Sequence, residues 1–342
     1  MSKRFFILST LGLGIGGIKY FTMGGKNNYS PDMDGKVVVV TGGNTGIGKE
    51  TVRELLRLHS TVIFTGRDAK KAQGMVDEII REHQGRNRRS PEVVFIPVDY
   101  SDLESVKVFA STFLNKYTYL HALVNNAGQY NSEQKVSRQG VEMTMAVNYL
   151  APVYLTHLLM PALQRTPDSR VINVASMAHE GMTMTGPKYE PNMDDFLLDK
   201  MIAEKKYNAG VAYTNSKLAN IYFTKGLDKY FQRKGLQMKT ASLHPGVVRT
   251  ELTRGAGMLQ YFILPFYPLI WLATKSEFEG AQTTLATTLM PFNKLTSGAY
   301  YSDCEVKTTS PASTNQAHID KAWNESIERL KKLTGEKTIF GQ

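Results

Sequence analysis

The sequence predicts an α/β fold, a single doubly wound parallel sheet of about seven strands with helices on both faces. Two observations support this fold class. Apolar, β-branched runs of strand length alternate with helical patterns, which is typical of parallel sheets covered on both sides. The first run, Lys36–Val40, leads directly into a glycine-rich turn and then a helical pattern, as nucleotide-binding strand–turn–helix units do.

The expected elements follow the order of a Rossmann-type fold. Strands are predicted at residues 36–40, 61–65, 93–98, 121–125, 170–175, 239–244 and 298–302. Helices are predicted at residues 47–58, 68–84, 101–116, 142–164 and 211–231, with one more before the last strand. The third of these helices is expected to open at Ser101, and the fourth to continue through Pro152.

The chain of 342 residues is expected to hold one folded domain over 34–333, between an apolar segment at 1–30 and a tail at 334–342. No linker divides it, and α/β folds of this length are often single domains. The single cysteine, Cys304, excludes an intrachain disulfide and a Cys-rich zinc site. The seven histidines show no metal-ligand spacing, so no metal is expected.

The formal net charge is +10, but the positive residues are scattered. One cluster, Arg81 to Arg89, lies between a predicted helix and a predicted strand. It is typical of a solvated loop or of a surface that meets anionic lipid. Nucleic-acid binding is therefore not expected.

The N-terminal segment is apolar or small over residues 5–18, after Lys3 and Arg4. A helix from Phe5 to Phe21 would fall just short of a bilayer core at about 1.5 Å per residue. Four interpretations stay open: a membrane anchor, a cleaved signal peptide, a mitochondrial presequence, or a helix packed on the domain. An uncleaved anchor is favoured, because there is no clear A-x-A cleavage site.

Tyr213 and Lys217 are four residues apart in a predicted helix, so they share one face of it. A free tyrosine, with a pKa of about 10, transfers protons poorly at neutral pH. A nearby ammonium favours the phenolate and lowers that pKa, so the pair can act as an acid/base unit. Alone, such a pair is more typical of a solvated helix face.

The turn after the first strand contains Gly42, Gly46 and Gly48. Glycines at this spacing allow a tight turn and a close approach of the backbone to a phosphate. The following helix offers free N–H groups and the positive end of its dipole. An ordinary strand–turn–helix is the alternative.

Further motifs complete a recognisable set. They are Asn125-Asn-Ala-Gly128, the helix asparagine Asn148, the strand-end serine Ser176, and Pro245-Gly-x-x-x-Thr250. With the glycine-rich turn and the Tyr/Lys pair, they make the chain resemble the short-chain dehydrogenase/reductase family over roughly residues 34–333. Within it, the chain is similar to the retinol dehydrogenase branch, and its first residues resemble the mitochondrial member of that branch.

The resemblance implies a catalytic tetrad of Asn148, Ser176, Tyr213 and Lys217. Tyr213 would donate a proton to a carbonyl oxygen or remove one from an alcohol, and Ser176 would hydrogen-bond that oxygen. Lys217 would lower the tyrosine pKa and bind the nicotinamide ribose. Asn148 would hold the helix geometry and a water that relays protons from Lys217.

The resemblance also implies a set of cofactor-binding residues. They are Gly42, Asn44, Thr45, Gly46, Ile47, Gly48, Arg67, Asp99, Asn125, Ala127, Gly128, Tyr213, Lys217, Pro245, Gly246, Val248 and Thr250. NAD enzymes place a carboxylate at the end of the second strand, but here none precedes Asp68. Arg67 offers a planar fork for a 2′-phosphate, so NADP(H) is expected, with an ordinary surface arginine as the alternative. Asp99 would hydrogen-bond the adenine or else cap the next helix.

The segment from Met258 to Ala273 is strongly apolar and contains Pro265 and Pro268. It follows Thr250, where the family has its substrate lid, so a lid is favoured over core packing. Such a surface suits a lipophilic aldehyde or ketone, retinal included, and could touch a membrane surface.

Two other functions stay open, a non-catalytic nucleotide-binding subunit of a membrane complex and a soluble steroid or sugar dehydrogenase. The protein is expected at a membrane through its N-terminus, the mitochondrial inner membrane being favoured and the endoplasmic reticulum the alternative. A homodimer or association with a membrane complex is also open.

Overall fold

The computed structural model describes residues 22–85, 91–181, 190–248 and 274–342. In this part of the chain one eight-stranded sheet has the order β3-β2-β1-β4-β5-β6-β7-β8. The strands are β1 (Val37–Val40), β2 (Thr61–Gly66), β3 (Val93–Pro97), β4 (Ala122–Asn125), β5 (Arg170–Val174), β6 (Lys239–His244), β7 (Tyr300–Ser302) and β8 (Glu305–Val306). The first seven are parallel and confirm the predicted sheet. The two-residue β8, which pairs antiparallel with β7, is an addition to it.

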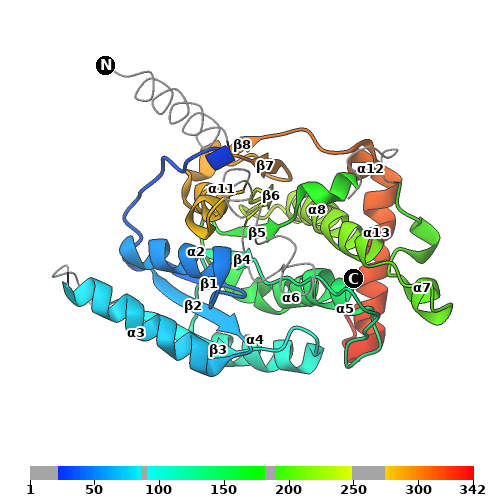
Figure 1. Ribbon diagram of the computed structural model, residues 1–342, viewed down its shortest axis with the longest axis horizontal. Helices are drawn as coiled ribbons and strands as arrows, with labels where there is room; N and C mark the ends of the chain where they lie inside the picture. The colour runs from blue at the N-terminus through cyan, green and yellow to red at the C-terminus, as the bar shows by residue number, and fades with distance from the viewer. Residues whose placement is uncertain (1–21, 86–90, 182–189, 249–273) are drawn as a thin grey trace, which may run out of the picture.

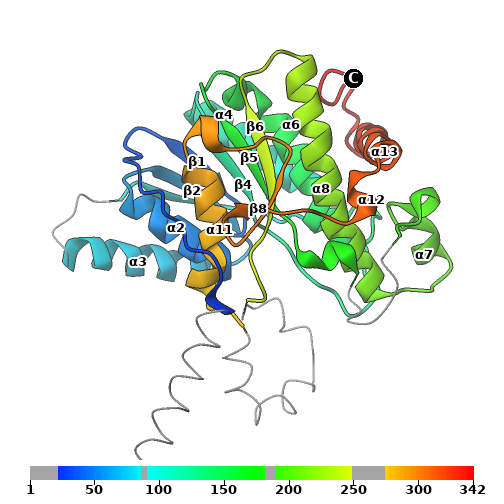
Figure 2. The same ribbon diagram turned by 90° about the horizontal axis from the view of Figure 1, so that it is seen from above.

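The main helices lie in two layers, one on each face of the sheet (Figures 1 and 2). They are α2 (Gly46–Arg57), α3 (Ala69–Gly85) and α11 (Glu277–Leu289) on one face, and α4 (Leu103–Lys116), α6 (Ala151–Gln164) and α8 (Ala209–Arg233) on the other. Successive side chains of a strand point to opposite faces. Val39 of β1 therefore packs in the core beneath α4, α6 and α8, whereas Val38 and Val40 pack in the core beneath α2.

The strand order reverses at β1. From there the chain proceeds through β2 to β3 on one side of the sheet, and it continues with β4, β5 and β6 on the other. The loops after β1 and β4 therefore diverge. In doubly wound sheets, ligands bind in the crevice that such a reversal leaves at the carboxyl ends of the strands.

The helix predicted over residues 142–164 is confirmed over Met143–Gln164, but it contains a π-helical turn that the sequence did not predict. The short α5 (Met143–Met145) passes into a π-helical turn (Ala146–Leu150) before α6 begins. Pro152 follows this π-helical turn, in the first turn of α6. The interruption falls on Asn148, one of the predicted catalytic residues.

Segments at both ends of the described chain pack on these layers. The N–H of Asn27 donates to Oε1 of Gln282 in α11 at 3.1 Å. At the other end α13 (Gln316–Thr334), which the sequence analysis did not place, lies along α8 (Figure 1). Phe340 is 2% exposed, and its ring stacks on Trp323 with centroids 5.2 Å apart. The packed unit thus extends beyond residues 34 and 333 in both directions.

None of the helices within the described ranges is long and apolar enough to cross a membrane. Most of the predicted anchor, at residues 1–21, lies outside the described residues, as does the predicted lid at 258–273.

Candidate active site

A cavity of about 440 Å³ opens at the carboxyl ends of β1 to β4. The predicted cofactor residues that line it are Gly42, Asn44, Thr45, Gly46, Ile47, Gly48, Arg67, Asp99, Ala127 and Gly128. The residues that line it without having been predicted are Gly66, Asp68, Lys71, Val98, Tyr100, Asn126, Gln129, Tyr130 and Val147. Most of this second group are sequence neighbours of the predicted residues. Extending each motif by one residue would therefore have found most of them.

The first turn of α2 faces the cavity with backbone N–H groups. Thr45 is the N-cap, and its side chain makes no capping hydrogen bond. Gly46 has a φ of +59°, which other residues rarely adopt. A Cβ at Gly48 would meet the carbonyl oxygen of Gly42 and would lie 2.6 Å from Nδ2 of Asn126. The turn is thus closely packed, and the helix end suits a phosphate.

Two basic residues, Arg67 and Lys71, line the cavity just beyond the end of β2. The nearest carboxylate in sequence, Asp68, accepts a hydrogen bond from the N–H of Lys71 at 3.0 Å. Its carboxylate therefore takes part in the first turn of α3. The two cations beside the cavity match what a 2′-phosphate requires.

Asp99 lines the cavity after β3 and also shapes its own turn. Its Oδ1 accepts hydrogen bonds from Ser101, from the N–H at 2.9 Å and from the hydroxyl at 2.8 Å. Neither residue caps α4, so the predicted start at Ser101 was wrong. The N-cap is Asp102, because its carboxylate accepts the free N–H of Glu104 at 3.1 Å.

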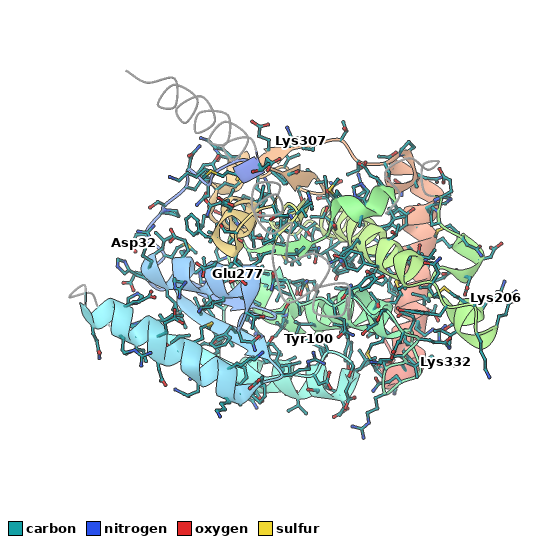
Figure 3. The ribbon with its side chains drawn as sticks, viewed as in Figure 1. Asp32, Tyr100, Lys206, Glu277, Lys307 and Lys332 are labelled. Atoms are coloured by element: carbon teal, nitrogen blue, oxygen red, sulfur yellow. The ribbon has the colours of Figure 1, made fainter. Side chains whose placement is uncertain are left out.

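Tyr100 forms a buried part of the lining. In Figure 3 it lies over the middle of the fold, whereas the charged Asp32, Lys206 and Lys307 lie at the periphery. Its hydroxyl shares a hydrogen bond of 2.7 Å with Oγ1 of Thr65. Burial raises the pKa of this hydroxyl, so Tyr100 stays neutral and serves as a fixed wall.

Thr41 holds the loop after β4 against the glycine-rich turn. Its hydroxyl accepts the N–H groups of Asn126 at 2.9 Å and of Ala127 at 2.8 Å. Asn125, which was predicted to bind the cofactor, does not line the cavity. It is 4% exposed, and its Nδ2 donates to Oδ1 of Asn173 at 2.9 Å. Asn126 lines the cavity instead.

The predicted acid/base pair borders this cavity. Tyr213 and Lys217 lie one turn apart on α8, with Nζ of the lysine 5.6 Å from the centre of the tyrosine ring. Ser176, which follows β5, hydrogen-bonds with Tyr213. The Tyr213 ring packs edge-on against Tyr130, with centroids 5.8 Å apart, and Tyr130 lines the cavity.

The π-helical turn directs Asn148 to the loop after β4. Its Oδ1 accepts the N–H of Gln129 at 2.8 Å, and its Nδ2 donates to the carbonyl oxygen of Gln129 at 3.0 Å and to Oγ of Ser216 at 3.1 Å. A Cβ at Gly128 would lie 3.4 Å from Oδ1 of Asn148 and 3.5 Å from Nζ of Lys217. Asn148 and Lys217 therefore converge behind Gly128, at the cavity wall.

The prediction that Lys217 lowers the pKa of Tyr213 was wrong for this structure. Burial raises the pKa of Tyr213 to about 12, with the Ser176 hydrogen bond acting against it. Burial lowers the pKa of Lys217 to about 8, and its Nζ donates to the carbonyl oxygen of Val174 at 2.9 Å. Desolvation is the main cause for both groups, because both are taken out of water.

The remaining predicted cofactor residues follow β6. Pro245, Gly246 and Val248 do not line the cavity, and Thr250 lies outside the described residues. The loop adjoins His244, the last residue of β6, whose pKa burial lowers to about 4. That imidazole is therefore neutral at physiological pH.

Known proteins that are similar to this chain point to one family. The family model described as short chain dehydrogenase matches residues 36–190. Retinol dehydrogenase 12 of Bos taurus is 36% identical over 313 residues, which cover 92% of this chain and 92% of that protein.

Two solved structures share the fold. An uncharacterized protein from Mycobacterium paratuberculosis superposes with a TM-score of 0.69 at 25% identity, over 93% of this chain and 99% of that one. A short chain dehydrogenase from Shigella flexneri, complexed with NADP, superposes with a TM-score of 0.58 at 18% identity, over 81% and 100%. The chain therefore belongs to the short-chain dehydrogenase/reductase family and is an oxidoreductase related to the retinol dehydrogenases.

Proposed function

We propose that this protein is an NADP(H)-dependent oxidoreductase that interconverts a lipophilic aldehyde or ketone, such as retinal, and its alcohol. One observation carries the proposal: Tyr213, Lys217 and Ser176 converge beside a cavity that also contains the glycine-rich turn and Arg67. This layout brings an acid/base group together with partners for the phosphates of a dinucleotide.

Three features of the cavity support NADP(H). The N-terminal N–H groups of α2 suit a pyrophosphate. The tight packing at Gly48 leaves no room for a side chain, so the helix end stays close to the glycine-rich turn. Arg67 and Lys71 suit the 2′-phosphate. When bound, the cofactor supplies the hydride, and the protein supplies position and charge.

In the direction of carbonyl reduction, Tyr213 is the proposed proton donor. Its pKa of about 12 keeps the hydroxyl protonated at neutral pH. Ser176 would hold the same carbonyl oxygen with a second hydrogen bond. The alcohol oxygen takes the tyrosine proton, and the ammonium of Lys217 would stabilise the phenolate that remains. Asn148, beside Lys217, would hold the water that returns the proton.

The lipophilic substrate is proposed on two grounds. The relative from Bos taurus is a retinol dehydrogenase, and Tyr130 and Val147 add apolar surface to the cavity wall next to the acid/base pair. The apolar segment at 258–273 is the proposed lid.

Membrane association through the N-terminal segment is part of the proposal. The apolar residues 5–18 after two positive charges support it. The mitochondrial inner membrane is favoured over the endoplasmic reticulum. The folded part at 34–333, with the segments that pack on it, would be the catalytic unit.

The test uses purified full-length protein with NADPH and a panel of lipophilic aldehydes and ketones, retinal included. We expect NADPH oxidation, followed by absorbance, with at least one lipophilic carbonyl, and no turnover of sugars. NADPH binding without turnover of any carbonyl would contradict the proposal and indicate a non-catalytic nucleotide-binding subunit.

Arg67→Leu tests the cofactor preference. A charge-assisted contact contributes roughly 1.5–3 kcal/mol, so the KM for NADPH should rise about tenfold or more. The KM for NADH should change little. Initial rates with both cofactors measure this, and Arg138→Leu, an exposed arginine outside the cavity lining, is the control. Equal losses with both cofactors would mean that Arg67 is structural.

A further inference from the structure

Lys275 joins the loop after β6 to a distant part of the chain. It is 6% exposed, although lysine is rarely buried without a partner. Its N–H donates to the carbonyl oxygen of Val247 at 2.8 Å, and it forms a parallel β-bridge with Val248. The backbone of the 245–248 loop is thus held by Lys275.

The side chain of Lys275 also passes directly beneath that loop. A Cβ at Gly246 would lie 2.5 Å from Cδ and 2.7 Å from Cε of Lys275, so only glycine leaves room for the lysine stem. The ammonium then reaches Asp303, in the turn between β7 and β8, with Nζ 2.6 Å from Oδ1. The lysine therefore spans from the loop to the hairpin.

The N-terminal segment meets the same ion pair. The N–H of Gly25 donates to Oδ1 of Asp303 at 3.3 Å. Gly24, with a φ of +69°, lies so close that an added Cβ would meet both Oδ1 of Asp303 and Nζ of Lys275. Asn27 continues the contact by its hydrogen bond to Gln282. Three segments remote in sequence thus meet at one buried ammonium.

The strand order indicates which end of the proposed cofactor lies near the 245–248 loop. Arg67 and Asp99 follow β2 and β3, on one side of β1, whereas Ser176 and the 245–248 loop follow β5 and β6, on the other. A dinucleotide that lies across the sheet, with its 2′-phosphate at Arg67, has its reactive end on the side of β5 and β6.

We propose that Lys275 is a positioning residue, which with Asp303 and the Gly24–Gly25 segment holds the 245–248 loop against the reactive end of the cofactor. The inference rests on the proposed function. The ion pair does not touch the cofactor in this assignment. It acts by fixing the backbone of a loop that follows directly from β6.

The test compares two ligands on the full-length protein: NADPH, which occupies the whole site, and 2′,5′-ADP, which occupies only the adenosine end. We expect Lys275→Met and Asp303→Asn each to raise the Kd for NADPH by at least about fivefold. The Kd for 2′,5′-ADP should stay unchanged. The double variant should be little worse than either single one, because both remove the same interaction. Lys307→Met, which removes the exposed pair with Glu305 on the same hairpin, is the matched control.

Gly24→Ala tests the N-terminal part of the junction. It places a methyl group against the ion pair and should also weaken NADPH binding without affecting 2′,5′-ADP. Gly35→Ala is its control, since Gly35 has a similar φ of +72° with nothing within 4 Å of an added Cβ.

Asp303 is partly exposed, at 45% of its side chain, so Asp303→Asn remains informative if Lys275→Met does not fold. Equal weakening of both ligands, or unchanged NADPH binding in Asp303→Asn, would overturn the positioning role. A wild-type protein that binds neither ligand would instead refute the proposed function, and the inference with it.

Discussion

Burial governs the ionisation of the two α8 residues at the candidate site. It keeps Tyr213 protonated and lowers the pKa of Lys217 to about 8. The lysine is still mostly charged at neutral pH, so a cation lies beside a neutral phenol. That combination suits proton donation to a carbonyl oxygen, and it requires the cation only after the proton has left.

Tyr213→Phe should reduce kcat by about 10²–10⁴-fold and leave NADPH binding nearly intact, because the ring contact with Tyr130 is kept. Stopped-flow or steady-state NADPH oxidation, together with fluorescence titration of NADPH, measures the two quantities. Tyr119→Phe, at a side chain that is 51% exposed, is the control. A Tyr213→Phe variant that retains most of the wild-type kcat would exclude the assigned role.

The lowered pKa of Lys217 should be visible in the pH dependence of stability. The pKa of Lys217 is about 8 in the folded chain, against its ordinary value of 10.5. At a pH between these two values the unfolded chain binds a proton that the folded chain has lost, so the free energy of unfolding rises with pH. From about pH 8 to about pH 10 the wild type should gain about 2 kcal/mol relative to Lys217→Met. Urea denaturation of both proteins measures the difference. A parallel pH dependence would show that Lys217 has an ordinary pKa.

Among the elements, the turn before α2 depends on the absence of side chains. Gly48→Ala would force a methyl group against the Gly42 carbonyl oxygen and Asn126, at a cost of about 1–3 kcal/mol. We expect weaker NADPH binding as well as a lower Tm. Gly74→Ala in α3, with nothing within 4 Å, should instead stabilise the protein by about 0.5–1 kcal/mol. If both variants bind NADPH like the wild type, the turn is not the phosphate site.

Elements with local signals were predictable from the sequence, and those that depend on distant contacts were not. Short apolar runs predicted the strands, and the spacing of the glycines predicted the glycine-rich turn. The π-helical turn at Asn148 was not predicted, because what stabilises it is the amide pairing with Gln129 in another loop. Lys275 carried no local sign of its role, since its partners lie at Gly246 and Asp303. For the same reason Asn125 could not be told from Asn126 as the cavity residue.

At the scale of the whole molecule, the N-terminal segment divides into two parts. Deleting residues 1–21 should release the protein from membranes and preserve NADPH-dependent activity, because the contacts of Gly25 and Asn27 remain. Deleting residues 1–29 removes those contacts and should reduce activity. Flotation and carbonate extraction, with activity measured on each form, test this. Full-length protein that carbonate already extracts would rule out an anchor.

The packing of α13 against α8 has a consequence for how the protein responds to heat. The helix that bears Tyr213 and Lys217 is held by the sheet on one side and by the ring stack of Trp323 and Phe340 on the other. Helices buried on two sides belong to the most cooperative part of a fold and open only with the whole molecule. We therefore expect thermal inactivation to coincide with loss of the entire structure.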